Sequence, residues 1–435
     1  MDINHRWYYI KKYLHKKKIS HPWRKITIIA FFVERFSKND IGGVKTYLRW
    51  IASRLIADER KVMIIALLSK KDDLREEVID NIPVYRLNCG DFIDRIDEFN
   101  SLPESEKEFK ARELFHENDI ETTGLKLAEE LALFIKERNI QVIHFHNSFF
   151  ISPYALYFLK QKIELSRAPP FYFWVHSPSK SMTLPNGKVS DLYNALTSFQ
   201  NLFKEIYAVS NSVHNSLLNF GINSKVKYLG VDPNFYQINN DSRKEMREKL
   251  GFSEHSFVVI YTGRIIEEKG LDLLPKIYKE LIKRDHKNII TKFLLVGDGN
   301  YKDRLLQELE KENITNRFTF VSPVSQEDLV DYYSSADCFI LPSRREALGL
   351  SLLEAMSCSL PCVVNDLPSV HEIIQHPQNG IIIPQNNITE YVRWISSLII
   401  NKQLRRTIAD NARTTIEEKF NNQSHYKYFV FRLIK

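Results

Sequence analysis

Short apolar runs alternate with amphipathic stretches along most of the chain. The apolar runs are rich in β-branched and aromatic residues, which favour strands, and the stretches between them are helical in character. In the first half the predicted strands are Ile26–Val33, Val62–Leu68, Val84–Leu87, Val142–His146, Phe171–His176 and Ile206–Ser210. In the second half they are Phe257–Thr262, Phe293–Gly297, Phe318–Val321, Cys338–Pro342, Cys362–Asn365 and Ile381–Pro384. Because these runs are apolar at successive positions, we expect parallel strands buried on both faces, and so an α/β fold with two doubly wound, Rossmann-like halves.

The boundary between the halves is predicted at a turn rich in glycine and proline, Leu229–Asn234. A chain of 435 residues is too long for one ordinary core, which also favours two domains. The last segment is helical in character, and such a tail can fold back to tie two domains together. We predict a basic aromatic N-terminal segment (1–25), a first domain (26–230), a second domain (231–415) and a C-terminal helix (416–435) that crosses back to the first domain.

One long polar stretch, Asp91–Glu121, interrupts the alternation of strands and helices in the first half. It is rich in acidic residues and has no strand-like run. We therefore expect a helical insertion on the surface of the first domain, at the edge of a cleft.

Composition changes this picture little, whereas charge adds one feature. Hydrophobic residues make up 43% of the chain and charged residues 26%, as in soluble globular proteins rather than disordered ones. Much of the net charge of +7 lies between His5 and Lys25, where tryptophan and tyrosine are interleaved with lysine and arginine. Two interpretations of residues 5–25 stay open: a helix or leader packed on the first domain, and a helix lying on an anionic membrane surface. No motif that reads RNA or DNA follows, so nucleic acid is not an expected partner.

Export and membrane-spanning signals are not expected. The first apolar run is too short, and follows too many charges, to be a signal peptide. No segment approaches the roughly 20 apolar residues that a spanning helix needs. The cysteines lack paired spacing, which favours reduced residues of a cytosolic protein over a metal site; they are Cys89, Cys338, Cys358 and Cys362. We predict a cytoplasmic protein, peripheral on the inner membrane if the basic segment binds lipid.

The first candidate ligand contacts follow the strand that ends at Thr262, because ligands of open α/β sheets bind at the carboxyl ends of strands. Gly263 lets the backbone approach a ligand closely, and Arg264 and Lys269 are suited to hold a diphosphate. The alternative is a pair of surface cations, with Lys269 paired to a neighbouring acid within the stretch Glu267–Glu268.

Two later turns carry further candidates. Gly297–Gly299 ends a strand in a tight turn that can seat a nucleotide base or ribose edge, or can be an ordinary strand-to-helix turn. After the strand ending at Pro342, a helix is predicted to start near Gly349. The bare N–H groups at such a helix start form an anion site; here they belong to Gly349, Leu350 and Ser351.

Two acids accompany this helix start. Glu346 stands in the loop before the helix and is placed to face sugar hydroxyls, and Glu354 lies in the second turn, where it can reach a ribose diol. An acid within an otherwise apolar helix is costly to bury without a partner. The alternative for both acids is a salt bridge to Arg344 or Arg345.

The spacing of these two acids matches the E-x7-E motif of retaining glycosyltransferases with the two-domain GT-B fold, and the chain resembles glycosyltransferase family 4 (glycosyl transferases group 1). Three more segments are similar to its diphosphate loop, its base-side turn and the helix before its donor strand: Tyr261–Gly270, Leu295–Gly299 and Ser325–Asp337. The resemblance covers about residues 226–364. It implies a GT-B fold, with two Rossmann-like domains facing across a cleft, the first binding the acceptor and the second the nucleotide-sugar donor.

The first half resembles the family more loosely. Gly43 belongs to a glycine-rich turn that opens a helix, as a loop near the donor phosphate does in the family. The resemblance also adds Asn211 and Val324 to the substrate-binding residues. His144, His146 and His176 end two successive strands, and the resemblance places His176 beside the transferred sugar as a catalytic residue. A core histidine stays the alternative for all three.

The resemblance implies transfer with retention, catalysed by His176, Arg264, Lys269 and Glu346. The donor is expected to be a nucleotide-diphosphate sugar, most simply a UDP-sugar carrying a hexose, with no further cofactor. No Asp-x-Asp motif stands at a matching strand end, so no metal is expected and the two cations would replace one. The acceptor is expected to be a glycan or a lipid-linked molecule in surface polysaccharide or lipopolysaccharide biosynthesis.

Ala347 and Leu348 stand where many members have glycine and an aromatic residue, which leaves the sugar open. Two alternative functions also stay open. One is a sugar-nucleotide epimerase on the same fold, and the other is a non-catalytic sugar-nucleotide-binding protein.

Overall fold

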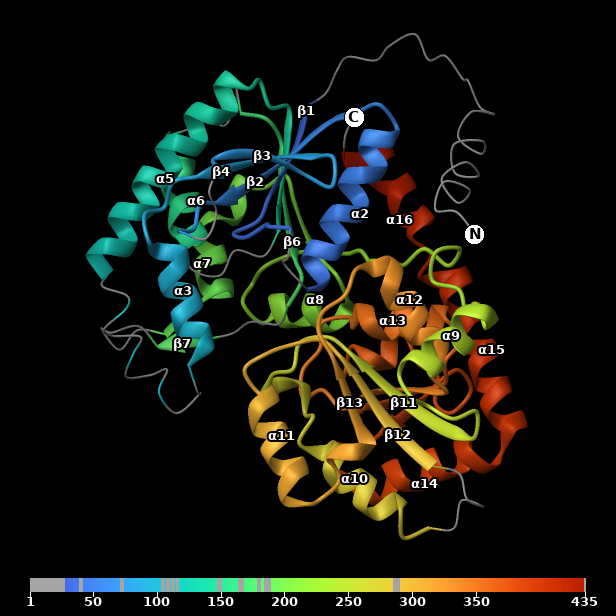
Figure 1. Ribbon diagram of the computed structural model, residues 1–435. Helices are drawn as coiled ribbons and strands as arrows, with labels where there is room; N and C mark the ends of the chain where they lie inside the picture. The colour runs from blue at the N-terminus through green and yellow to red at the C-terminus, as the bar shows by residue number, and fades with distance from the viewer. Residues whose placement is uncertain are drawn as a thin grey trace.

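Two parallel sheets, one in each half of the chain, form the framework of a computed structural model (Figure 1). The structure describes residues 28–38, 42–70, 74–102, 106, 110, 114, 117–146, 151–162, 168–177, 181–183, 189–284 and 290–433. The basic N-terminal segment lies outside these residues. None of the helices in the described ranges is long and apolar enough to cross a membrane.

The first sheet has the strand order β10-β9-β6-β5-β1-β2-β4-β3. Its strands are β1 (Ile28–Phe32), β2 (Lys61–Leu67), β3 (Glu76–Ile79), β4 (Ile82–Leu87), β5 (Val142–His146), β6 (Phe171–Val175), β9 (Glu205–Ala208) and β10 (Lys225–Val226). All neighbours pair in parallel except β3, which is antiparallel to β4. In the centre, Ile29 of β1 pairs with Val62 on one side and Val142 on the other.

Helices cover both faces of this sheet because each buries an apolar stripe. In α2 (Gly43–Ala57) the buried positions Leu48, Ile51, Ala52 and Leu55 recur at helical spacing. The other elements are α3 (Phe92–Ser101), α5 (Glu117–Glu137), α6 (Ile151–Lys162), α7 (Leu192–Phe199), α8 (Asn211–Leu218) and the hairpin β7 (Ser181–Thr183) and β8 (Val189–Asp191).

The second sheet has the order β13-β12-β11-β14-β15-β16, all parallel. Its strands are β11 (Ser256–Thr262), β12 (Ile290–Val296), β13 (Phe318–Val321), β14 (Cys338–Leu341), β15 (Cys362–Asn365) and β16 (Ile381–Ile383). The helices of this half are α9 (Asn240–Lys249), α10 (Leu273–Leu281), α11 (Lys302–Lys311), α12 (Gln326–Ser335), α13 (Leu350–Ser357), α14 (Ile388–Ile400) and α15 (Lys402–Lys419).

The predicted α/β fold with two doubly wound halves is confirmed, and each predicted strand run overlaps a strand. The elements that sequence patterns missed are short or marginal. Strand β3 begins with two glutamates and exposes Val78 at the edge of the sheet, and β10 has two residues. The described part of the stretch after Asp91 is helical, but α3 does not lie wholly on the surface, because Phe92, Ile93 and Ile96 are buried in the core.

The chain crosses from one half of the molecule to the other twice, and the two crossing segments lie side by side. The amide of Val231 donates to the carbonyl of Phe420 at 2.9 Å, and the amide of Asn422 donates back to Val231 at 3.0 Å. Beyond this crossing, α16 (Asn422–Tyr428) lies beside α2 (Figure 1), and the hydroxyl of Tyr426 donates to the carboxylate of Asp58. The last helix therefore packs on the first half of the chain.

Candidate functional site

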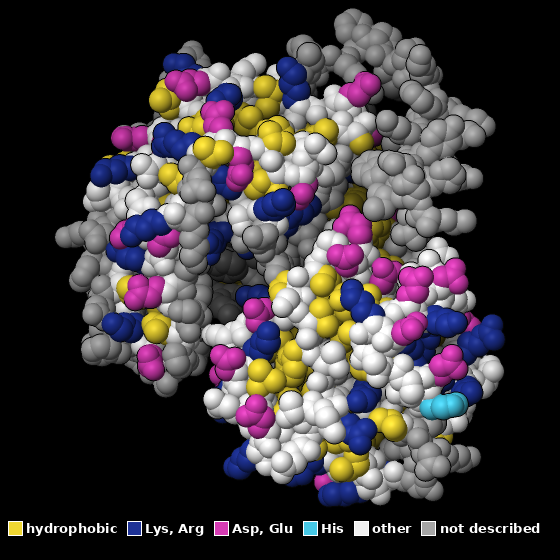
Figure 2. All heavy atoms as spheres, in the orientation of Figure 1, with side chains coloured by type: hydrophobic (Ala, Val, Ile, Leu, Met, Phe, Trp, Pro, Cys, Tyr) yellow, Lys and Arg dark blue, Asp and Glu magenta, His cyan; other side chains and the backbone are white. Residues whose placement is uncertain are grey.

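Three loops lie together at the carboxyl edge of the second sheet, because they follow the parallel strands β11, β12 and β14. They contain nearly all the candidate residues of the second half. On the face shown in Figure 2, a hollow separates the two lobes of the molecule, and Lys and Arg side chains lie beside it.

The loops after β11 and β12 touch through their backbones. Gly297 has φ 148°, and a Cβ there would lie 1.9 Å from the carbonyl oxygen of Gly263. The amide of Ile265 also donates to the carbonyl of Asp298 at 2.8 Å. Gly297 is therefore required for the close approach of these loops, which is a structural role beside the predicted ligand role.

The loops after β11 and β14 are tied as closely. A Cβ at Gly270 would lie 2.1 Å from the carbonyl oxygen of Pro342. The amide of Arg344 donates to the carbonyl of Glu268 at 2.9 Å, and its guanidinium lies 2.7 Å from the carboxylate of Asp272. Arg344 therefore joins the two loops.

Lys269 and Glu346 form an ion pair between these two loops. The Nζ–Oε1 distance is 2.5 Å, and Oε1 also accepts from the hydroxyl of Ser343 at 2.8 Å. These contacts of Lys269 and Glu346 do not involve the alternative partners considered from the sequence, and Arg345 lies 3.7 Å from Glu268 instead. The structure thus brings a candidate diphosphate cation and a candidate sugar-binding acid into direct contact.

Buried polar groups hold the backbone around Glu346. The side-chain amide of Asn365 donates to the carbonyls of Pro342 and Ser343 at 2.7 and 3.1 Å. The hydroxyl of Ser369 donates to the carbonyl of Glu346 at 2.9 Å. This loop is therefore fixed from β15 and from the turn after it.

Arg264 has an exposed side chain at the start of its loop. The hydroxyl of Tyr261 donates to the carbonyl of Arg264 at 2.6 Å. Burial raises the pKa of Tyr261 well above its ordinary value, the charge of Glu346 raises it further, and the charge of Arg264 opposes the rise. Arg264 and Glu346 therefore act on the same hydroxyl, which places both charges in one neighbourhood.

Helix α13 starts where the sequence predicted. Gly349 precedes it with φ 82°, a left-handed conformation that glycine adopts readily. In its first turn, the N–H groups of Leu352 and Leu353 donate to the carbonyl of Gly349 at 3.0 and 3.2 Å, whereas those of Leu350 and Ser351 have no acceptor within the helix. Opposite lies the first turn of α2: a Cβ at Gly43 would be 3.0 Å from Cδ1 of Leu350. Two helix starts, one from each half, thus meet at this point.

Glu354 is buried and holds two tyrosine hydroxyls instead of an arginine. Tyr333 donates to Oε2 at 2.9 Å and Tyr236 donates to Oε1 at 3.1 Å. Burial raises the pKa of Glu354 to about 7, although the two hydrogen bonds lower it. The predicted salt-bridge alternative is therefore wrong for Glu354, and both tyrosines are residues that sequence reasoning missed.

The three candidate histidines do meet, but mainly each other and aromatic rings. Nδ1 of His146 lies 2.8 Å from Nε2 of His176, and the indole of Trp174 donates to Nδ1 of His144 at 3.1 Å. His144 and His146 are fully buried, whereas His176 is partly exposed at the end of β6. Burial lowers the pKa of His176 to about 3, with the charge of His425 adding to the effect, so its ring is neutral near pH 7.

Of the three remaining candidates, Gly299 follows β12, where a Cβ would lie 2.3 Å from the carbonyl oxygen of Ile265, and the other two lie at helix starts. Val324 is half-buried just before the N-cap of α12. The backbone and side-chain amides of Asn211 donate to the carboxylate of Glu372, at 2.7 and 3.1 Å. Asn211 is thus engaged by a residue of the second half that no sequence motif singled out.

Family comparisons divide the chain as the two sheets do. Residues 41–235 match the model described as Glycosyltransferase Family 4, and residues 242–415 match the model described as Glycosyl transferases group 1. The N-acetyl-alpha-D-glucosaminyl L-malate synthase of Bacillus anthracis is 23% identical over 326 residues, which are 72% of this chain and 80% of that protein. For two other curated relatives the chain spans about half of the relative's length, 55% and 48%.

Solved structures show the same architecture over nearly the whole chain. The sucrose-phosphate synthase of Thermosynechococcus elongatus superposes with a TM-score of 0.73 at 17% identity, covering 93% of this chain and 97% of that one. HepE of Anabaena, crystallised with UDP and glucose, superposes with a TM-score of 0.67 at 18% identity, covering 93% and 99%. The fold is therefore GT-B.

Proposed function

Because the chain belongs to the glycosyl transferases group 1 and glycosyltransferase family 4, it is a glycosyltransferase, and we propose that it transfers a hexose, with retention, from a UDP-sugar to a hydroxyl of a glycan or lipid-linked acceptor. The observation that carries the proposal is the meeting of Lys269, Glu346 and the start of α13 at one edge of the second sheet. The complex of HepE with UDP and glucose supports UDP as the nucleotide.

The donor is held by groups with separate roles. Arg264 and Lys269 neutralise the diphosphate, and the first N–H groups of α13 donate to its oxygens. Glu346, already fixed by Ser343, accepts from sugar hydroxyls. Glu354 accepts from the ribose diol, which requires its carboxylate to share acceptor capacity with two tyrosines.

In the transfer step the bond between the anomeric carbon and the diphosphate oxygen breaks. The acceptor oxygen forms the new bond from the same face, and its proton passes to the leaving diphosphate. Negative charge grows on that diphosphate, so fixed cations and backbone dipoles stabilise the transition state. His176, neutral and partly exposed, is suited to hydrogen-bond the sugar rather than to act as a cation.

The acceptor side belongs to the first half of the chain. We place the reaction in polysaccharide or glycoconjugate synthesis, in line with the relatives, with the more specific assignment to surface polysaccharide or lipopolysaccharide as part of the proposal. The protein would act in the cytoplasm or at the inner membrane surface, where the basic segment at residues 5–25 contacts anionic lipid.

A thermal-shift panel of UDP-, GDP- and ADP-sugars, followed by an assay of nucleotide release, tests the donor. We expect a UDP-sugar to raise the Tm most, and UDP release to depend on an acceptor hydroxyl and to persist in EDTA. Arg264→Ala should abolish release, whereas Arg406→Ala, an exposed control in the same half, should not. A UDP-sugar that is epimerised without an acceptor, or bound without turnover, would overturn the transferase proposal.

A further inference from the structure

A carboxylate of the second half is bound by the start of a helix in the first half. Glu372 ends a short turn of 3-10 helix after β15, and its two oxygens accept from the amides of Asn211 and Ser212 at 2.7 and 2.8 Å. Oε2 also accepts from the hydroxyl of Tyr228 at 2.8 Å. Each of these donors precedes the crossing at Val231, so the contact joins the two halves.

Helix α8 lacks an acid of its own at this end. Its N-cap residue Ser210 accepts from the amide of Val213 at 3.2 Å, and its first turn contains no acidic residue. The amides of Asn211 and Ser212 therefore need an external acceptor, and the helix dipole favours a negative one. Glu372 supplies it.

The same short segment, residues 369–372, also contacts the loop that holds Glu346. Ser369, three residues before Glu372, donates to the carbonyl of Glu346 at 2.9 Å. On its other side, Tyr228 stands next to the crossing of the chain, with its ring 5.4 Å from that of Phe420. Hydrogen bonds thus connect the Glu346 loop through residues 369–372 to the first half.

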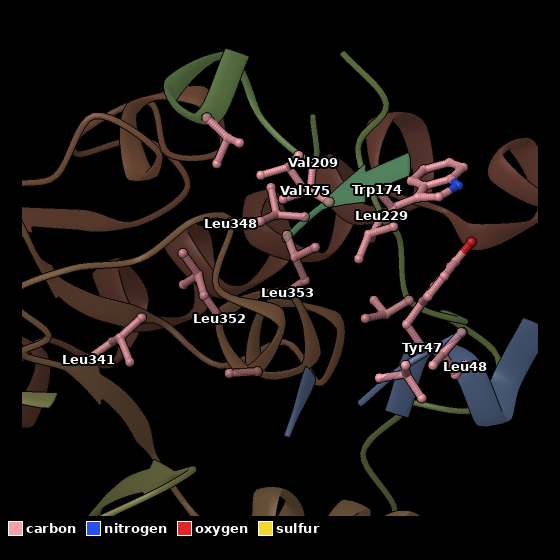
Figure 3. Close-up of a cluster of buried hydrophobic side chains, with 14 of the residues drawn as sticks. Tyr47, Leu48, Trp174, Val175, Val209, Leu229, Leu341, Leu348, Leu352 and Leu353 are labelled. Carbon is pink, nitrogen blue, oxygen red and sulfur yellow. The ribbon is translucent and has the colours of Figure 1, made fainter. Parts of the chain in front are cut away.

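Apolar contacts accompany this polar one. Figure 3 shows Leu348 and Leu353 of the second half in one buried cluster with Val175 and Val209 of the first. Such a surface excludes water but is not directional, whereas the hydrogen bonds to Glu372 fix one relative orientation.

We propose that Glu372 is a positioning residue that latches the two domains in the arrangement seen here, and that residues 369–372 couple the Glu346 loop to this closure. The latch itself does not depend on the identity of the substrate. Its effect on turnover rests on the proposed function, because closure would bring the acceptor to the donor sugar.

The test compares Glu372→Ala with Asn211→Pro. Proline is tolerated at the first position of a helix, and it removes both donors of Asn211 while keeping α8. Glu310→Gln, exposed on α11, serves as the control. Spin labels at Glu137→Cys and Lys311→Cys, one exposed site in each half, report the distance between domains, since the native cysteines are buried.

We expect one narrow distance distribution in the parent and the control, and a broad, longer one in both latch variants. The double variant should be no broader than Glu372→Ala alone, because Glu372→Ala already breaks the two hydrogen bonds that Asn211→Pro removes. With substrate, kcat/KM for the acceptor should fall about tenfold while the Kd of UDP changes less than twofold. An unchanged distribution in Glu372→Ala would overturn the latch, whereas a changed distribution in a protein that turns over no sugar would overturn only the proposed function.

Discussion

Nζ of Lys269 lies 2.5 Å from Oε1 of Glu346, and the two side chains are only 17% and 11% exposed. The pair spans two loops that are about 77 residues apart in the chain and that share several backbone hydrogen bonds. Because both side chains are mostly buried, their electrostatic attraction is stronger than it would be in water, and each side chain orients the other. The pair therefore fixes the position of the Lys269 cation in the fold itself.

Lys269→Met should lower kcat by about 10²–10³, because losing one donor that stabilises a developing anion costs about 2.7–4 kcal/mol of barrier. Arg406→Met, which removes an exposed cation on α15, should leave kcat unchanged. Both are measured as acceptor-dependent UDP release under saturating donor. A kcat within twofold of the parent for Lys269→Met would contradict the assigned role.

Glu354 makes the stability of the protein depend on pH. Burial raises its pKa to about 7 from an ordinary 4.5, so it stabilises the folded state below pH 4.5 and this contribution is lost as the pH rises through about 7. Glu354→Gln fixes a neutral side chain. Its Tm relative to the parent should therefore rise between pH 5 and pH 8.

Glu310→Gln, an exposed change of the same kind, is the control for this pH series and should show no such trend. In the parent protein the affinity for UDP should increase from pH 5 to pH 8, because only the ionised Glu354 accepts two hydrogen bonds from a ribose diol. Equal Tm differences at both pH values would show that the carboxyl group is not protonated in the fold.

The fold was predictable because its signals are local. Runs such as Phe257–Ile260 are apolar at every position, and a strand buried on both faces needs no more than that. The pairing of Lys269 with Glu346 could not be predicted, because several acids lie nearer in sequence and only the tertiary structure chooses among them. The contact between Gly297 and Gly263 could not be predicted either, because it joins loops that follow two different strands, β12 and β11.

The partners of Glu354 show the same limit. Tyr236 lies in the turn after the domain crossing, and Tyr333 lies on α12, in a segment that resembles the family but gave neither tyrosine a role. Glu372 was missed for a different reason: its partners belong to the other half of the chain. Motifs singled out the loops after β11, β12 and β14, which lie together, but not the polar groups that hold these loops in place.

Acid should destabilise the first half through its buried histidines. Burial is the main cause that lowers the pKa of His144 to about 3 and that of His425 to about 4, with nearby charge as a lesser cause. Their stabilising contribution is present above their ordinary value of 6.5 and is lost as the pH falls towards these folded values. For each proton taken up on unfolding, the free energy of unfolding decreases by about 1.4 kcal/mol for each unit by which the pH falls.

His144→Phe should reduce this acid sensitivity. Nε2 of His144 is buried without a hydrogen-bond partner among the described residues, and the ring lies against Tyr172 and Phe429, so phenylalanine fills the same space. It also removes the acceptor of the Trp174 indole, which lowers the Tm at both pH values alike. The Tm difference between pH 7.5 and pH 5 should be smaller than in the parent. His255→Phe, at an exposed position, should keep the parent difference, and the same result for His144→Phe would contradict the assignment.

Gly297→Ala tests whether the contact between the loops after β11 and β12 is needed for UDP binding. The new Cβ would lie 1.9 Å from the carbonyl oxygen of Gly263, so one loop must move. Gly251→Ala is the matched control, because its φ of +67° strains alanine by about 1–2 kcal/mol but nothing lies within 4 Å of the new atom. By calorimetry, we expect a larger fall in Tm for Gly297→Ala than for Gly251→Ala. By titration with UDP, we expect at least about a tenfold loss of affinity for Gly297→Ala alone, because Arg264 and Gly263 move with the loop. Equal UDP affinities in the two variants would mean that this loop contact does not shape the donor site.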